Sequence, residues 1–253
     1  MRIAKYSFGI LILTLTACDS EMVSPLRQLV KEIEDQTCYT DHFTYQDGGL
    51  STFKRVFGSR EETSINFIYS DNKLIRIETV RDQGLESTIE LLYNEKGQRS
   101  QETLTMVYNG ETTYIRTGTF TYINDQLKSI KYTYNKPDYS TEEREFHWSK
   151  DNLIRIDFYY YFNEQRFPSI SRLYTYDNKL NYSNQDIAFI YTVGTGDETK
   201  FSKNNLVSMQ EIIDTEIYQG GQYSFTYNDS GYPVKYVYKS GGQEFTPIQI
   251  RYY

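Results

Sequence analysis

The chain has 253 residues and a formal net charge of −7, and its 27 basic residues are scattered without forming a run. Nucleic-acid binding needs a basic stripe, so no nucleic-acid partner is expected. Tyrosine is the extreme of the composition, with 26 residues, and the only alanine after residue 17 is Ala188. Because Ala is the best helix former and aromatic residues favour strands, this composition predicts an all-β protein.

The N-terminal residues are typical of an export signal. Arg2 and Lys5 precede an apolar stretch, residues 6–15, that is too short to span a bilayer. Leu15-Thr16-Ala17-Cys18 follows and resembles the lipobox of bacterial lipoproteins. The resemblance implies a signal peptide over residues 1–17 and a Cys18 thiol acylated with chains such as palmitate. It also implies anchoring to the envelope of a Gram-negative-type bacterium, at its outer membrane. The alternative is an ordinary secretory signal with a chance cysteine.

Residues 18–37 are expected to be a lipid-anchored tether with a short amphipathic helix. Ser24-Pro25 is typical of an N-cap followed by proline at the first helical position. The apolar residues that follow have the i, i+3, i+4, i+7 spacing of one helix face, so a helix is predicted from Ser24 to about Asp35. Its apolar stripe is expected to pack on one end of the sheet, the alternative being a partner. The face consists of Leu26, Leu29, Val30 and Ile33.

Cys38 has no disulfide partner if Cys18 is a thioether. It stands at the expected start of the first strand. Two interpretations remain, a small buried apolar residue or a reactive thiol.

From residue 38 to residue 253 a unit of about 24 to 29 residues recurs eight times. Each copy has an aromatic residue, here called the anchor, then a short polar turn and a new apolar run. A period in this range indicates one supersecondary unit repeated along the chain. The anchors are expected to pack on one side of the sheet, and six of them, Tyr69, Tyr93, Tyr122, Trp148, Tyr176 and Tyr227, are expected to be substantially buried. The full set of anchors is Tyr45, Tyr69, Tyr93, Tyr122, Trp148, Tyr176, Phe201 and Tyr227.

Each unit is expected to contain two strands. Apolar and polar residues alternate with period two, as in Tyr232 to Lys239, and the turns after the anchors contain residues that tolerate a left-handed backbone. Eight such units predict an antiparallel β-meander of about sixteen strands. Open sheets of that size curl, so we expect a strongly coiled sheet, either a closed or a half-open barrel.

The units Tyr227-Asn228-Asp229-Ser230-Gly231 and Tyr93-Asn94-Glu95-Lys96-Gly97 resemble the YD (RHS-type) repeat. The chain over roughly residues 39–253 also resembles uncharacterised outer-membrane lipoproteins built of degenerate YD-like units. That resemblance implies a porin-like antiparallel meander and carries no activity with it.

No catalytic or metal-binding motif is found, and no enzymatic activity or cofactor is expected. His42 and His147 lie in strand patterns, and no set of zinc ligands at workable spacing surrounds them. There is no Gly-x-Ser-x-Gly elbow. The acidic pairs Glu61-Glu62 and Glu142-Glu143 could be glycosidase carboxylates, but solvated charges are expected.

The tyrosines favour a non-enzymatic binding or scaffolding surface on the envelope, with a glycan or an envelope protein as ligand. The alternative is a carrier that holds an apolar molecule in a half-barrel, and an integral barrel is a third possibility. A groove of tyrosine rings edged by Asn, Asp and Arg would favour recognition. An interior of Ile, Phe and Leu would favour the carrier.

Overall fold

The computed structural model describes residues 28–35, 38–58, 60–81, 84–136, 139–181, 183, 188, 191 and 198–253. The predicted signal peptide, Cys18 and the first four residues of the predicted helix lie outside these residues. Within the described part of the chain, no helix is long and apolar enough to cross a membrane.

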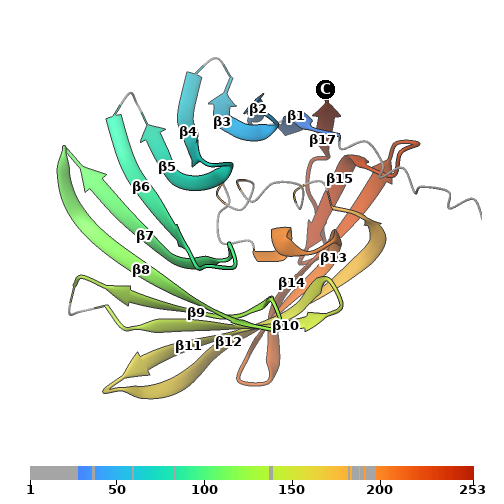
Figure 1. The fold of residues 1–253 in the computed structure, drawn as a ribbon. Helices are drawn as coiled ribbons and strands as arrows, with labels where there is room; N and C mark the ends of the chain where they lie inside the picture. The colour runs from blue at the N-terminus through green and yellow to red at the C-terminus, as the bar shows by residue number, and fades with distance from the viewer. Residues whose placement is uncertain are drawn as a thin grey trace, which may run out of the picture.

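All strands belong to one antiparallel sheet that closes on itself (Figure 1). Consecutive strands pair from β1 to β15, β15 pairs with β17, and β17 returns to β1. Because β16 has only two residues, the wall has sixteen principal strands, as predicted, and the barrel is closed. The strands are β1 (Val30–Asp35), β2 (Thr40–Gln46), β3 (Gly49–Phe57), β4 (Arg60–Ser70), β5 (Lys73–Arg81), β6 (Gly84–Tyr93), β7 (Arg99–Tyr108), β8 (Glu111–Ile123), β9 (Gln126–Tyr134), β10 (Glu142–Ser149), β11 (Asn152–Phe162), β12 (Gln165–Leu180), β13 (Asn204–Ile213), β14 (Glu216–Tyr227), β15 (Pro233–Ser240), β16 (Gln243–Glu244) and β17 (Ile248–Tyr252).

The predicted N-terminal helix is wrong where it can be checked, because Val30–Asp35 is strand β1. The register of β1 against β17 shifts between Val30 and Glu32. The extra residue of this bulge, Lys31, places Val30 and Ile33 on the same face, where both are buried. The spacing of three that suggested a helix therefore comes from a bulged strand. The β domain accordingly begins at Val30 and not at residue 38.

A β-bulge recurs at the anchors. Tyr69 pairs with Leu74 whereas Ile68 pairs with Arg76, so Ile75 is the extra residue. Leu74 and Ile77 thus face inward together although they are three residues apart. The same shift occurs at Tyr45, Tyr93, Tyr122, Trp148, Tyr176 and Tyr227. Bulges bend a strand and increase its twist, which helps the sheet to close.

One predicted hairpin is wrong. Tyr176 to Leu180 was expected to contain a turn, but β12 runs through to Leu180. Tyr176 pairs instead with Leu206, beyond a connection over residues 181–203. Phe201 lies in the short 3-10 helix η3 (Glu198–Phe201) of that connection. The eighth unit is formed by the chain ends, where Tyr252 pairs with Val30.

The barrel has two unlike rims. The anchor rim carries the turns that follow the anchors, such as Asp47-Gly48 and Asp71-Asn72, both with positive φ. The apolar rim carries the other eight connections, from β1–β2 to β15–β17. Seven of these, all but β1–β2, present an exposed large apolar side chain at or beside the turn. They are Phe57, Leu85, Tyr108, Tyr139, Phe162, Tyr218 and Phe245.

Two hydrophobic clusters lie inside the barrel. One centres on Phe43, Leu50 and Phe53, and the other on Phe146, Leu153 and Ile156. Phe201 packs against both, and the connection after β12 contributes the buried Tyr191 and Ala188 to the first. Other buried residues of this connection are Ser183, Thr199 and Ser202. The interior is therefore occupied in part by the chain itself (Figure 1).

Candidate functional site

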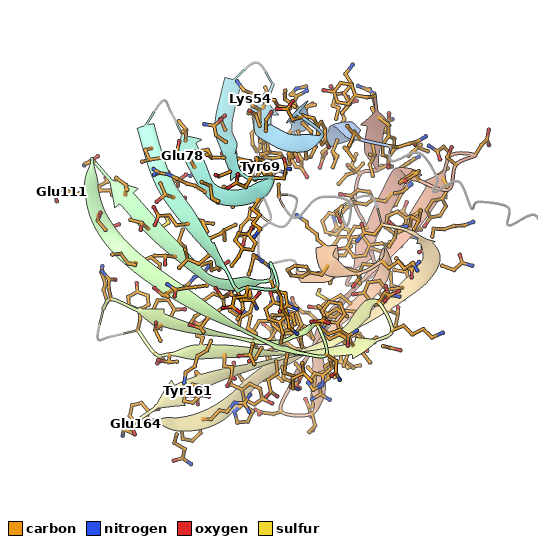
Figure 2. The ribbon with its side chains drawn as sticks, viewed as in Figure 1. Lys54, Tyr69, Glu78, Glu111, Tyr161 and Glu164 are labelled. Atoms are coloured by element: carbon orange, nitrogen blue, oxygen red, sulfur yellow. The ribbon has the colours of Figure 1, made fainter. Side chains whose placement is uncertain are left out.

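A groove of about 780 Å³ opens at the anchor rim, and its lining runs from β2 to the β6–β7 turn. Tyr69 and Tyr93 are two of its walls, and Phe67 and Leu74 contribute apolar surface. Figure 2 labels Tyr69 on β4. The polar edge is supplied by turn residues, which the short hairpins hold at the rim. These edge residues are Gln46, Asp47, Ser51, Asp71, Asn72 and Lys73.

The two tyrosines are fixed by the repeat. Tyr69 donates its hydroxyl to the carbonyl of Leu50 at 3.0 Å, and Tyr93 donates to that of Leu74 at 2.7 Å. Gly49 leaves room for the Tyr69 ring, because a Cβ there would lie 3.3 Å from the ring. Lys73 Nζ lies 5.6 Å from the centre of the Tyr93 ring. Burial raises the pKa of Tyr93, so its phenol remains a hydrogen-bond donor at neutral pH.

The anchors were expected to be substantially buried, and all six that were singled out, Tyr69, Tyr93, Tyr122, Trp148, Tyr176 and Tyr227, are partly buried. Their polar tips explain why burial is incomplete. Trp148 donates Nε1–H to Leu127 at 2.8 Å, and Tyr176 donates to Leu153 at 2.6 Å. Tyr69, Tyr93, Trp148 and Tyr176 thus reach the backbone of the preceding hairpin, whereas Tyr227 donates to the carboxylate of Asp177.

The interior wall also contains a buried charged cluster, which was not predicted from the sequence. Arg99 donates to the Tyr191 hydroxyl, and that hydroxyl donates to Glu102 at 3.0 Å. Arg99 and Glu102 are both almost inaccessible. Burial, with a contribution from the nearby Glu102, raises the pKa of Tyr191 well above its usual value. Tyr191 is therefore a neutral donor that links the wall to the segment inside the barrel.

Arginines and aromatic rings alternate along the inner face from β8 to β12. The guanidinium of Arg116 lies 4.4 Å from the Tyr132 ring, and that of Arg144 lies 5.0 Å from it on the next strand. Arg144 and Arg172 lie 5.4 and 4.9 Å from the ring of Phe158. Arg172 also pairs with Glu211 at 2.9 Å. An inner wall of this composition is unlike the aliphatic lining expected of an apolar carrier.

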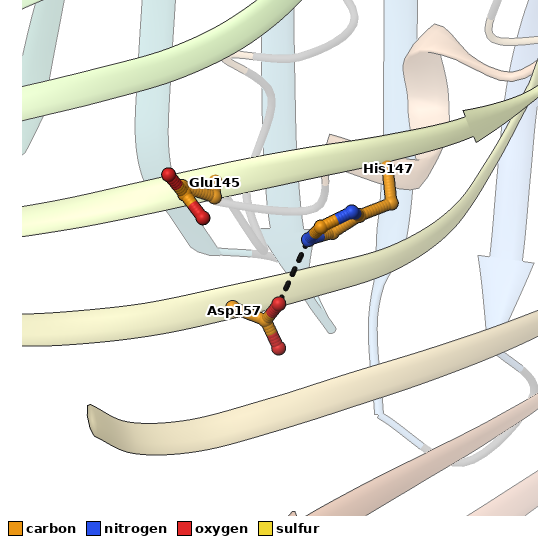
Figure 3. Close-up of side chains that lie close together, drawn as sticks. All are labelled: Glu145, His147 and Asp157. Carbon is orange, nitrogen blue, oxygen red and sulfur yellow. Dashed lines mark hydrogen bonds and ion pairs between the residues drawn. The ribbon is translucent and has the colours of Figure 1, made fainter.

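Glu145, His147 and Asp157 bring three possible metal ligands together on the outer wall (Figure 3). His147 Nε2 lies 2.7 Å from Asp157 Oδ2. The same carboxylate accepts from Arg155 at 2.7 Å and Ser171 at 2.6 Å, and Glu145 pairs with Arg166 at 3.1 Å. Two guanidinium groups therefore already neutralise the carboxylates. The cluster fits an ion-pair network that crosses from β10 to β12 better than a cation site.

The other candidate residues from the sequence, Cys38, His42 and the acidic pairs, do not form a common site. Cys38 is exposed between β1 and β2, so the interpretation as a small buried apolar residue is wrong. His42 Nδ1 lies 3.2 Å from Glu32 on the outer wall. Glu142 and Glu143 point to opposite faces, and Glu143 pairs with Arg166 at 3.0 Å. The side chains of Glu61 and Glu62 lie outside the described residues.

The residues that line the groove were predicted from the sequence only as anchors and turn residues, not as binding residues. Tyr69, Asp71 and Asn72 belong to one repeat unit, and Tyr93 is the anchor of the next. Only the barrel shows that Asp47, from the unit before, faces the same space. Sequence spacing could have indicated such a groove between any two neighbouring units, but not which pair leaves room for it.

No family model matches the chain, and no curated protein does. Two solved structures have a similar fold. A porin-like protein from Bacteroides uniformis ATCC 8492 is 14% identical, with a TM-score of 0.56, over 90% of this chain and 97% of that one. A porin-like protein from Bacteroides vulgatus ATCC 8482 is 12% identical, with a TM-score of 0.59, over 89% and 99%. At this identity the likeness shows the fold alone. The chain is thus a closed antiparallel β-barrel of porin-like fold, and the YD-repeat resemblance stays a prediction.

Proposed function

We propose that the protein is a non-enzymatic, lipid-anchored binding protein of the bacterial envelope, and that the anchor-rim groove binds a glycan. The groove carries this proposal. Two tyrosine rings held by backbone hydrogen bonds offer flat apolar faces, and carboxylate, amide and ammonium groups surround them. Aromatic rings stack on the C–H faces of sugars, while polar neighbours bond the hydroxyls. A groove of tyrosine rings with a polar edge is the feature that, on the sequence criterion, favours glycan or protein recognition over an apolar carrier.

The interior argues against the alternative of an apolar carrier. Its inner wall carries Arg99, Glu102, Arg116, Arg144 and Arg172, and the segment after β12 fills part of the space. An apolar ligand would have to cover these groups without pairing them, which costs free energy.

The anchoring part of the proposal rests on Cys18 and on where the described chain begins. Gln28 accepts a hydrogen bond from Asn228, a turn residue of the anchor rim, at 3.0 Å. The described chain therefore begins beside that rim. Mass spectrometry of membrane fractions should show an acylated Cys18 at the mature N-terminus, and Cys18→Ala should release the protein. A mature protein that retains Met1 would contradict lipidation.

Glycan binding is tested with purified protein lacking the leader and Cys18, against soluble oligosaccharides of defined sequence, by calorimetry. Tyr93→Leu should weaken binding at least tenfold, because it removes one aromatic face of the groove. Tyr176→Leu is the matched control, since Tyr176 makes the same bond to the preceding hairpin but does not line the groove. Both variants should lose similar stability, and only the first should lose binding. Equal loss of binding in both, or no binding of any oligosaccharide, would contradict the proposal.

A further inference from the structure

The apolar rim defined above is unlike the rest of the surface. Seven of its eight connections, all but β1–β2, expose at least one large apolar side chain, and β13–β14 exposes both Ile217 and Tyr218. Tyr108 and Tyr218 are 70% exposed and Phe162 is 62% exposed. Both ends of the barrel carry exposed apolar residues, but six of those at the apolar rim are aromatic, and exposed aromatic rings gathered at one end mark a candidate contact surface. The exposed apolar residues near the other end are aliphatic side chains beside the turns and the terminal Tyr253.

Two hairpins of the apolar rim also form a depression. A groove of about 690 Å³ lies between the β9–β10 connection and the β11–β12 hairpin. Tyr139 and Phe162 line it, and Lys131 Nζ lies 4.4 Å from the centre of the Tyr161 ring beside them. Ser140, Asn163 and Glu164 supply polar lining, so the depression suits a partner side chain with an apolar stem and a polar or basic tip.

Charge decides what kind of partner fits. Arg81 and Lys239, at the apolar rim, pair with Glu86 at 3.3 Å and with Glu244 at 2.7 Å. Among the described residues of these turns, four acidic side chains form no ion pair, against the single base Lys136. They are Glu111, Glu164, Asp214 and Glu216. Figure 2 labels Glu111 and Glu164 at hairpin ends on one edge of the barrel. The turns of the apolar rim thus carry exposed apolar side chains and unpaired acidic side chains together, and this set of four acids is called the acidic border below.

The N-terminal end of the described chain and the apolar rim lie at opposite ends of the barrel. The described chain begins at the anchor rim, where Gln28 meets Asn228. The apolar rim lies at the other end of every strand. A chain tethered through its N-terminus can therefore bind at the anchor rim and at the apolar rim independently.

We propose that the apolar rim is a docking surface for a second protein, whose contact face is apolar at its centre and basic at its border. Tyr108, Phe162 and Tyr218 supply the apolar contacts, and the acidic border selects the partner's charge. An anionic lipid surface would be repelled by that border, and a second copy of this chain would bring like charges together. The proposal does not depend on glycan binding at the opposite rim.

The test uses the full chain in cells of its own species, with a photo-crosslinking phenylalanine analogue at single positions. Tyr108 and Tyr218 should give an adduct with the same protein. Ile123, which is 55% exposed but at the anchor rim, is the matched control and should not. The captured protein is then purified and its affinity for the barrel is measured at low and high salt.

Tyr108→Ser and Tyr218→Ser should each weaken that affinity at least tenfold, and Ile123→Ser should leave it unchanged. Glu111→Lys and Glu216→Lys should weaken it too, and their effect should shrink at high salt because exposed charges are screened. All five side chains are exposed, so circular dichroism should show an unchanged fold. Four results would overturn the proposal: adducts with lipid, adducts with the chain itself, equal adducts at Ile123, or no adduct at all.

Discussion

The anchors show how one side chain joins neighbouring units of the barrel. Trp148 and Tyr176 each pack a ring against the inner cluster and send a polar tip to a carbonyl of the preceding hairpin. A backbone carbonyl next to a bulge lacks a regular ladder partner, and the anchor supplies a donor for it. This explains why Tyr and Trp, and not Phe or Leu, occupy most anchor positions. It also explains why the anchors are only partly buried, since the tip must reach the edge of the sheet.

Trp148 should matter more for stability than its partial exposure suggests. Trp148→Ala should reduce the free energy of unfolding by about 3 kcal/mol, because it removes a large ring and leaves the Leu127 carbonyl without its donor. Trp148→Phe keeps most of the ring and should cost about 1 kcal/mol, as for one hydrogen bond. Urea unfolding measures both. Ile154→Ala, an exposed neighbour, serves as the control and should change stability by less than about 0.5 kcal/mol.

Asp157 should make the barrel sensitive to acid. Burial acts to raise its pKa, but the hydrogen bonds from Ser171, Arg155 and His147 outweigh burial, and the pKa of Asp157 is lowered below its usual 3.8. A carboxyl whose folded pKa is depressed contributes stability above its unfolded pKa and loses it as pH falls. Asp157→Asn should therefore lower the melting temperature at pH 7, and the difference from the parent chain should shrink below about pH 3.8. A difference that is constant down to pH 2 would contradict this assignment.

At the scale of elements, the bulges limit how well the inward-facing residues of each strand can be predicted from the sequence. Strand alternation and left-handed turn residues predicted the approximate number of strands and their sequential antiparallel order, because both are local signals, but they missed β1 and placed a turn inside β12. The bulges are not local, since an extra residue is recognised only against its partner strand. Thus Leu153 and Ile156 read as opposite faces of a strand but both face inward. For the same reason Val30 and Ile33 imitated a helix face.

The turns offer a direct test of this local chemistry. Asp214-Thr215 closes the β13–β14 hairpin with φ values of 48° and 74°. A β-branched residue at positive φ is strained, whereas glycine adopts it freely. Thr215→Gly should therefore stabilise the barrel by about 1 kcal/mol. Gly242, with a φ of 81° in the β15–β16 turn, gives the reverse experiment. Gly242→Thr should destabilise by a similar amount in thermal unfolding, and a neutral result in both would show that these turns relax.

At the scale of the whole molecule, the two rims and the filled interior could not be predicted from the sequence. The repeat makes every unit look alike, so it does not show which turns border a groove. Nor does it show that the connection after β12 would place Tyr191 against Arg99. These features depend on contacts between residues about 90 positions apart. What the sequence did indicate was the wall itself, including charged residues on both of its faces.

The outer wall leads to the last prediction, that the barrel does not need a bilayer to fold. Its mid-strand positions carry Arg76 paired with Glu78 at 2.9 Å, and the network of Glu145, His147 and Asp157. In a transmembrane barrel the same positions face lipid, and each Arg or Lys at mid-depth costs about 2–4 kcal/mol. Many such charges around the wall would prevent stable insertion despite the porin-like fold.

Residues 24–253, expressed without the leader and Cys18, should therefore be folded and monomeric in buffer without detergent. Like charges on the acidic border of the apolar rim should keep two copies apart. Circular dichroism and sedimentation velocity measure the fold and the mass. The lipidated chain is the control and should require detergent, because only the acyl chains on Cys18 enter the membrane. If residues 24–253 fold only in detergent or vesicles, the wall does face lipid. The groove would then belong to a membrane-spanning barrel rather than to a tethered binding protein.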